Sequence, residues 1–322
     1  MKIRMTNFDM ENNFWQALDK PILALAPMAG ITDSCFRQIC KDFGVDVVYS
    51  EMASSSALKF SSKKTLELLK FKKKERPYVV QLFGNNSEHF AVAVKIVMQK
   101  IKPDGIDINF GCPVKKVFKQ GAGVALMLDL NLSKKIIKAV CANSNVPVSI
   151  KIRSKIQDKT AINFVKNLSG FPIKAIMVHG RSYEQGFKGE IDIEVIKKIK
   201  KFFNGIVLAN GGIDSPEIAK KILVTSKADG LGIARGSQGK PWIFSQIKDY
   251  LKTGEYQEKT QKQIFKIALK HSKMAYQQKG NFGIIEMRKH LCWYVKNMPN
   301  ASSLRQEIIK AKNITDIEKN LR

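Results

Sequence analysis

The stretch I-L-A-L-A-P-M-A-G, residues 22–30, distinguishes between two α/β architectures for this chain. Its first half is a short apolar run of the kind that forms a buried parallel strand. A doubly wound, dinucleotide-binding sheet has a G-x-G-x-x-G turn after its first strand, because these glycines let the backbone approach a pyrophosphate. That turn is missing here, which favours a closed barrel over an open sheet.

Short apolar strands alternate with helical patterns along most of the chain. The predicted strands are Ile22–Ala26, Val47–Tyr49, Tyr78–Leu82, Gly105–Asn109, Val148–Ile152, Ala175–His179, Ile206–Asn210 and Gly230–Ile233. The helical patterns between them include Glu88–Ile101, Ser133–Ala142, Ile193–Phe202 and Ser215–Leu223. Strand–helix units of this number, within about 250 residues, match a (β/α)₈ TIM barrel. We predict such a barrel for residues 1–245, with the doubly wound sheet as the alternative.

From Trp242 onward the pattern is helical throughout, without a β-rich run. Residues 246–322 contain sixteen Lys and Arg against seven Asp and Glu. We predict that this segment is a second domain, a small basic helical bundle. The alternative is a set of solvated helix faces that closes the barrel. Lys63–Arg76 is a second basic stretch, and a solvated surface explains it equally well.

The chain of 322 residues carries a formal net charge of +27. This excess suits a polyanionic partner, either nucleic acid or an anionic membrane surface, although a lysine-rich proteome is the alternative explanation. Five cysteines without a C-x-x-C pair argue against a disulfide framework and against a zinc ribbon. No apolar run reaches membrane-spanning length, and the N-terminus lacks the pattern of a secretory signal. We expect a cytoplasmic protein that binds neither a membrane nor a metal.

In a TIM barrel the chemistry takes place where the strands end at their carboxyl side. In V-S-I-K-I-R, residues 148–153, the apolar residues share one face, so Lys151 points toward the barrel axis. His179 ends the next strand and faces the mouth. A cation in a barrel interior needs an anionic or strongly polar partner. That partner is either a bound anionic cofactor or, as the alternative, a salt bridge to Asp107 or Glu51.

Two loops rich in small residues follow the last two strands. They read A-N-G-G-I-D-S-P at residues 209–216 and G-I-A-R-G-S-Q-G at residues 232–239. Backbone N–H groups in such loops can approach a phosphate closely, and these loops are the usual phosphate site of the fold. Arg235 would add a charged, forked donor. The pattern therefore predicts a cofactor that bears a phosphate.

With these motifs the chain resembles the tRNA-dihydrouridine synthases, flavin enzymes that reduce uridine in RNA, and it is most similar to their bacterial B-type subgroup. The motifs are A-P-M-A-G-I-T-D at 26–33, G-C-P at 111–113, H-G-R at 179–181, N-G-G-I at 210–213 and R-K-H-L-C-W-Y-V-K at 288–296. The resemblance implies an FMN-dependent oxidoreductase that uses NADPH as the reductant. It also implies tRNA as the substrate, held by the barrel mouth and the basic C-terminal domain; it implies no particular oligomer.

The resemblance assigns roles to single residues. Cys112 would be the general acid, which gives a proton to carbon 5 of uracil after a hydride has reached carbon 6; inert packing is the alternative for this thiol. The implied cofactor-binding residues are Pro27, Met28, Ala29 and Gln81 around the flavin ring, Lys151 and His179 along the ring and ribityl chain, and Asn210, Gly211, Gly212, Ala234 and Arg235 at the phosphate.

Two other functions compete with this interpretation. One is an FMN oxidoreductase that acts on a free small molecule, which would need neither the +27 charge nor a basic helical segment. The other is a non-catalytic RNA-binding or chaperone protein on a barrel that has lost its cofactor. The presence of Cys112, Lys151, His179 and Arg235 argues against it. The aromatic residues Trp242, Trp293 and Tyr294 could stack on bases, but their helical spacing favours a place in the core.

Overall fold

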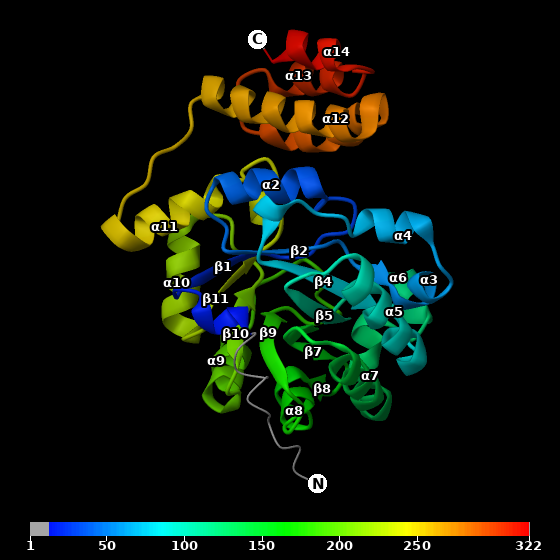
Figure 1. Ribbon diagram of the computed structural model, residues 1–322. Coiled ribbons are helices and arrows are strands. Elements are labelled where there is room, and N and C mark those ends of the chain that lie inside the picture. Colours follow the sequence, from blue (N-terminus) through cyan, green and yellow to red (C-terminus); the bar gives the residue numbers. More distant parts are fainter. Residues whose placement is uncertain (1–12, 322) are drawn as a thin grey trace.

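The eight predicted strands form, and they close into a parallel barrel (Figure 1). The computed structural model describes residues 13–321; residues 1–12 and 322, the outer ends of the two predicted domains, lie outside the described residues. The strands are β1 (Ile22–Leu25), β2 (Val47–Tyr49), β4 (Tyr78–Phe83), β5 (Gly105–Phe110), β6 (Val148–Arg153), β9 (Ile173–His179), β10 (Ile206–Asn210) and β11 (Gly230–Ile233). They pair in the order β2-β1-β11-β10-β9-β6-β5-β4, and a β2–β4 pairing closes the ring. The predicted (β/α)₈ TIM barrel is confirmed.

Both faces of each strand are buried, which explains why the strands are nearly continuous apolar runs. In β1, Leu23 and Leu25 pack against the surrounding helices, whereas Ile22 and Ala24 belong to a cluster inside the barrel. Trp15, from the short helix η1 (Phe14–Ala17), is part of this inner cluster. Its neighbours there include residues at the amino ends of strands, so η1 closes that end of the barrel.

Helices cover the outside of the barrel, and several begin at a side-chain cap. The longer ones are α2 (Ser34–Asp42), α5 (Ser87–Lys100), α7 (Leu130–Asn143), α9 (Ile193–Phe202), α10 (Pro216–Ser226) and α11 (Ile243–Thr253). Shorter elements are β3 (Ala53–Ser54), α3 (Ser55–Lys59), α4 (Lys63–Leu68), η2 (Lys73–Glu75), α6 (Lys115–Lys119), η3 (Gly123–Met127), a β7–β8 hairpin (Lys155–Ile156, Lys159–Thr160), α8 (Ala161–Lys166) and η4 (Arg235–Ser237). Ser215, for example, accepts a hydrogen bond from Ile218 N–H and is followed by proline at the first helical position.

The last three helices form a separate layer above α2 (Figure 1). They are α12 (Gln261–Tyr294), α13 (Ala301–Ile308) and α14 (Ile314–Asn320), and they share a hydrophobic cluster that also takes in Cys35 and Trp242. The predicted boundary after residue 245 falls within α11, which packs beside α10 on the barrel. The division into two domains stays a prediction.

Helix α12 contains a reversal of the chain at Gly280, where φ is 59° and ψ is −146°. The ring centroids of His271 and His290 lie 4.9 Å apart. A straight helix would separate two such residues by about 28 Å at 1.5 Å per residue. The element is therefore a hairpin of two antiparallel halves. A side chain at Gly283 would overlap the carbonyl oxygen of Ala275, so glycine allows the two halves to meet closely.

Candidate active site

A cavity of about 730 Å³ opens at the carboxyl ends of the barrel strands. Every residue of the predicted catalytic and cofactor-binding set lines it, from the Pro27–Ala29 turn after β1 to Arg235 after β11. Its volume lies within the range of about 300–1,000 Å³ that is usual for small-molecule sites. The structure thus brings together in one cavity the residues that were predicted from separate strand ends.

One end of the cavity, the glycine-rich end, is formed by residues 210–213 and 234–236. Gly211 has φ +110°, and a Cβ there would lie 2.6 Å from Cδ2 of His179. A Cβ on Gly236 would overlap the carbonyl oxygen of Ile213. Glycine is therefore required at both positions. Among residues 13–321, none accepts a backbone hydrogen bond from the N–H groups of Gly212 or Gly236.

The other end, the cysteine end, is built around Gln81, Asn109, Cys112, Lys151 and Arg153. Asn109 Oδ1 accepts hydrogen bonds from the N–H groups of Gly111 (3.0 Å) and Cys112 (2.8 Å). Asn109 Nδ2 donates to Gln81 Oε1 at 2.8 Å. Side-chain contacts therefore fix the backbone that carries the Cys112 thiol.

The chain of side chains continues below Gln81 into the barrel. Gln81 Nε2 donates to Asp107 Oδ2 at 2.7 Å, and the Ser149 hydroxyl donates to Asp107 Oδ1 at 2.6 Å. Complete burial raises the pKa of Asp107 to about 6, although both of these hydrogen bonds favour the ionised carboxylate. Asp107 is a buried anchor for Gln81 and does not line the cavity.

The thiol of Cys112 lies at the cavity wall and is almost buried, with 9% of the residue exposed. Burial raises the pKa of this thiol above its usual value. A hydrogen bond from Val114 N–H and the charge of Arg153 oppose this rise but do not cancel it. The thiol is therefore protonated at neutral pH. Cys112 also contacts a small apolar cluster with Val117 and Ala122, so its catalytic role stays a prediction.

Lys151 points to the barrel axis, as predicted, and its Nζ donates to Asn210 Oδ1 at 3.0 Å. The alternative salt bridge to Asp107 or Glu51 is wrong: among the described residues Lys151 forms no ion pair, and Glu51 instead accepts a hydrogen bond from Gly30 N–H. Burial lowers the pKa of Lys151 to about 8, and the charge of nearby Arg153 acts in the same direction.

The electrostatics of the cavity favour an anionic occupant. Five cations line it (Lys151, Arg153, Arg181, Arg235 and Lys296), against a single carboxylate, that of Asp214. His179 adds no charge, because burial and then the positive charge of Lys151 lower its pKa to about 2. Cations crowded against each other without anions are costly, so a bound anion would relieve this repulsion.

Comparisons with known proteins bear on the family to which the chain belongs. A family model described as "Dihydrouridine synthase (Dus)" matches residues 24–322. The chain is 37% identical to tRNA-dihydrouridine synthase B of Pseudomonas syringae pv. tomato over 287 residues, which is 88% of this chain and 85% of the relative. It is 36% identical to the probable tRNA-dihydrouridine synthase of Rickettsia bellii over 310 residues, which is 94% of this chain and 91% of the relative.

The chain belongs to the dihydrouridine synthase family. The resemblance predicted from the sequence is confirmed, including the likeness to relatives named as B-type synthases. Among solved structures, histamine dehydrogenase from Rhizobium sp. 4-9 matches with a TM-score of 0.54 at 12% identity, over 78% of this chain and 48% of the other. At that identity the match shows a shared fold.

Several residues that line the cavity were not predicted as part of the site, and Arg153, Trp293 and Lys296 are three of them. Arg153 donates to the carbonyl oxygens of Gly111 (3.0 Å), Ser182 (2.8 Å) and Gly186 (2.9 Å). It therefore connects the loop after β5, which carries Cys112, to the loop after β9. Its place on the same strand face as Lys151 is the signal that could have identified it. The other two, Trp293 and Lys296, come from the end of α12 and its connection to α13.

The expectation of a core position holds for Trp242 and Tyr294, which are both buried, and is wrong for Trp293. Trp293 is partly exposed and lines the cavity, because the docking of α12 on the barrel turns it toward the mouth. A Cβ on Gly239 would overlap the backbone of Trp293, which shows how closely the loop after β11 and the end of α12 meet. No sequence pattern reports this contact.

The structure also bears on metals and membranes. Residues 13–321 contain no group of three His, Cys, Asp or Glu side chains that could hold a metal ion. No helix in the same range is both long enough and apolar enough to cross a membrane.

Proposed function

We propose that the protein is an FMN- and NADPH-dependent oxidoreductase that reduces specific uridines of tRNA to 5,6-dihydrouridine. The observation that carries this proposal is one cavity with the nearly buried Cys112 thiol at one end and a glycine-rich, arginine-bearing loop pair at the other. The relatives that are named tRNA-dihydrouridine synthases support tRNA as the substrate. A tRNA substrate in turn supports a cytoplasmic location.

The residues present fit FMN. The N–H groups of Gly212 and Gly236, which donate to no backbone acceptor among residues 13–321, and the guanidinium of Arg235, which lines the same cavity, suit a phosphate dianion. The Pro27–Ala29 turn, with Gln81, would contact the flavin ring; Lys151 and His179 would face the ring and ribityl chain, and Asn210, Gly211 and Ala234 would complete the phosphate pocket. When bound and reduced by NADPH, FMN supplies the hydride that carbon 6 of uracil accepts.

Cys112 then gives the proton to carbon 5 of uracil. The raised pKa keeps this thiol protonated until charge develops on the base. Arg153 and Lys151 lie close enough to lower the pKa of Cys112, which means that they stabilise the thiolate left after proton transfer. The hydrogen bonds from Gly111 and Cys112 N–H to Asn109 hold the acid in place during this step.

Residues 246–322 would form the RNA-binding domain beside a catalytic domain of residues 1–245. Their excess of Lys and Arg suits the phosphates of the RNA backbone. Trp293 and Lys296 bring this segment to the edge of the cavity, where the target base must arrive. A uridine stacked within folded tRNA has to be turned out of its stack to reach Cys112.

The test is reduction of a defined RNA by purified protein. Protein loaded with FMN is incubated with NADPH and an unmodified tRNA transcript, and the RNA is digested and analysed by mass spectrometry. A gain of two mass units at defined uridines is expected, as required by the addition of two hydrogens. A different result would identify an oxidoreductase for small molecules: NADPH reduces the flavin, and free uracil or another small pyrimidine reoxidises it, but tRNA does not.

A further inference from the structure

The turn that would contact the flavin, Pro27–Ala29, is held from below by Thr32. Met28 N–H donates to Thr32 Oγ1 at 3.1 Å, and Thr32 Oγ1 donates back to Met28 O at 3.2 Å. The N–H groups of Ile31 and Thr32 also donate to Met28 O, at 3.1 and 3.0 Å. Thr32 is fully buried, so its position sets that of the turn.

Thr32 is in turn fixed by Arg37, which lies in α2 and is fully buried. Arg37 Nη1 donates to Thr32 O at 2.7 Å, and Nη2 donates to Lys70 O at 3.0 Å. Its guanidinium lies 4.7 Å from the ring centroid of Tyr78 in β4. The Arg37 side chain is therefore fixed by contacts on three sides: Thr32 in the loop after β1, Lys70 in the chain before β4, and Tyr78 in the barrel wall.

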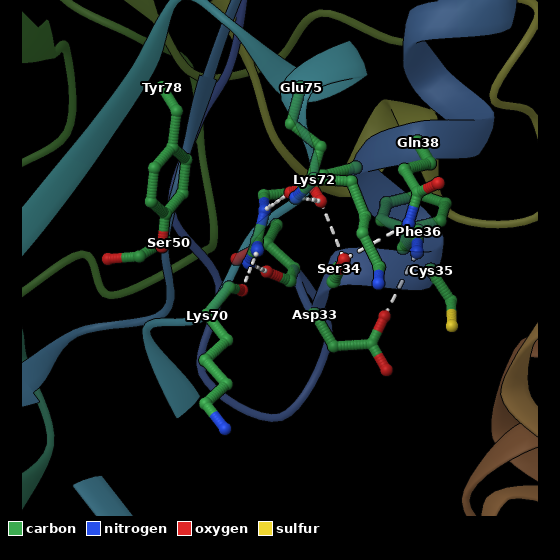
Figure 2. A network of polar contacts seen from close by, with 12 residues as sticks. Asp33, Ser34, Cys35, Phe36, Gln38, Ser50, Lys70, Lys72, Glu75 and Tyr78 are labelled. Carbon is green, nitrogen blue, oxygen red and sulfur yellow. Dashed lines mark hydrogen bonds and ion pairs between the residues drawn. The ribbon is translucent and has the colours of Figure 1, made fainter. Parts of the chain in front are cut away.

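Glu75 completes the arrangement, and it comes from the basic stretch Lys63–Arg76 (Figure 2). Its Oε2 accepts from Arg37 Nε at 2.6 Å; its Oε1 accepts from the Ser34 hydroxyl and from Lys72 N–H, both at 2.6 Å. Neither side chain of the Arg37–Glu75 pair has any exposed surface.

A fully buried ion pair is a poor source of stability, because the cost of removing two charges from water offsets most of their attraction. An apolar pair of similar volume is often as stable. What the ionic pair supplies is direction: the planar guanidinium donates along fixed lines to Thr32, Lys70 and Glu75. Neither residue lines the cavity, yet both connect to the Pro27–Ala29 turn through Thr32.

We infer that Arg37 and Glu75 are positioning residues that hold the Pro27–Ala29 turn in the geometry that binds the flavin ring. The inference rests on the proposed function only in taking FMN as the ligand. It extends that proposal to two residues that touch neither cofactor nor substrate.

The test compares FMN affinity and the visible circular dichroism of bound FMN among variants. In Arg37→Met/Glu75→Leu, no unpaired charge is left buried, so the protein should fold. We expect its dissociation constant for FMN to rise about tenfold or more, the scale of one hydrogen bond to a charged group. We also expect the flavin bands to change shape, because the ring sits against a displaced turn.

Arg37→Lys separates geometry from charge. It keeps the ion pair but loses the fork, since an ammonium cannot reach Thr32, Lys70 and Glu75 along the same lines. Its FMN affinity should fall as well, by less than in the double variant. A wild-type affinity in Arg37→Lys together with a loss in the double variant would overturn the geometric explanation.

The matched control is Asp229→Asn. Asp229 is a nearly buried carboxylate that pairs with Lys20 and Lys200 at the amino end of β11, away from the cavity. This variant should lower the melting temperature but leave FMN affinity and the flavin spectrum unchanged. If the folded double variant binds FMN like the wild type, the inference is wrong. If wild-type protein itself binds no FMN, the proposed function fails instead.

Discussion

At the glycine-rich end of the cavity the hydrogen-bond donors are mainly backbone N–H groups, whereas at the cysteine end the functional atoms sit on side chains held by other side chains. Gly211 and Gly236 are required because a Cβ would meet His179 or the Ile213 carbonyl. Cys112, in contrast, depends on a chain of amides and a carboxylate that runs through Asn109 to Asp107.

This difference indicates that the two ends differ in how they respond to substitution. Backbone donors exist whatever the neighbouring side chains are, so the glycine-rich end needs space and one charged residue, Arg235. The cysteine end needs several side chains in register, and one substitution there disturbs the others. We therefore expect changes at the two ends to separate cofactor binding from proton transfer.

The largest effect is expected for Cys112→Ala. Loss of a positioned general acid should slow reoxidation of reduced flavin by tRNA by a factor of about 10² to 10⁴. FMN affinity and reduction of the flavin by NADPH should stay near wild type, because neither requires the thiol. The measurement is single-turnover flavin absorbance under anaerobic conditions.

Cys141→Ala, on α7, is the matched control, since Cys141 does not line the cavity. An unchanged rate in Cys112→Ala would show that another group gives the proton. Loss of FMN binding in that variant would support the structural reading of Cys112.

Arg235→Ala should have the next largest effect, and at the opposite end. The affinity for FMN should fall about 10- to 100-fold, the equivalent of about 1.5–3 kcal/mol for hydrogen bonds to a charged group. With saturating FMN the rate of proton transfer should recover, because the cysteine end is intact. Quenching of flavin fluorescence on titration of the apoprotein gives the dissociation constant.

Riboflavin, which lacks the phosphate, is the control ligand. Its affinity should be the same in wild type and Arg235→Ala. An equal loss of affinity for riboflavin and for FMN would show that Arg235 does not contact the phosphate.

The sequence was sufficient to predict that residues 210–212 and 234–235 meet at one mouth of the barrel, because small residues after consecutive strands are a local pattern with a direct physical meaning. The strands and the direction of Lys151 were predictable for the same reason, because apolar runs and strand alternation are local patterns. Asn109 was visible at a strand end, but its role depends on where the Cys112 backbone folds back toward it. Trp293 lies far along the chain from the barrel, and only helix docking brings it to the cavity.

The Arg37–Glu75 pair shows a second reason for failure. The stretch Lys63–Arg76 was open to interpretation as a solvated surface, and its composition supports that view. One acidic residue in it, Glu75, is fully buried against Arg37, more than thirty residues earlier. Charge counts describe a segment, whereas burial is decided residue by residue in the folded chain.

Asn109→Ala tests whether the cysteine end works as a connected unit. The variant removes the acceptor for the Gly111 and Cys112 N–H groups and a donor to Gln81. Proton transfer should slow about tenfold, below the roughly hundredfold cost of a 1 Å displacement. FMN affinity should change less than in Arg235→Ala.

Asn85→Ala is the control, because Asn85 makes one exposed hydrogen bond, to Gln120 O, and does not line the cavity. A rate in Asn109→Ala equal to that in Asn85→Ala would mean that the Cys112 backbone is held without Asn109.

The smallest effect concerns pH, through Lys151, which belongs to the cysteine end and donates to Asn210 of the glycine-rich end. Its pKa of about 8 means that the side chain loses its charge as the pH rises from 7 to 9. A bound anion favours the charged form and so raises this pKa; by linkage, affinity for FMN falls as the pH rises through the pKa of the free protein. If binding raises the pKa by about one unit, the loss between pH 7 and pH 9 is about fivefold. The phosphate itself does not contribute, since its second pKa of about 6 lies below this window.

Lys151→Met should bind FMN more weakly at pH 7 and show a flat profile up to pH 9. A profile in Lys151→Met that falls as steeply as the wild type would assign the titration to another group at the cavity.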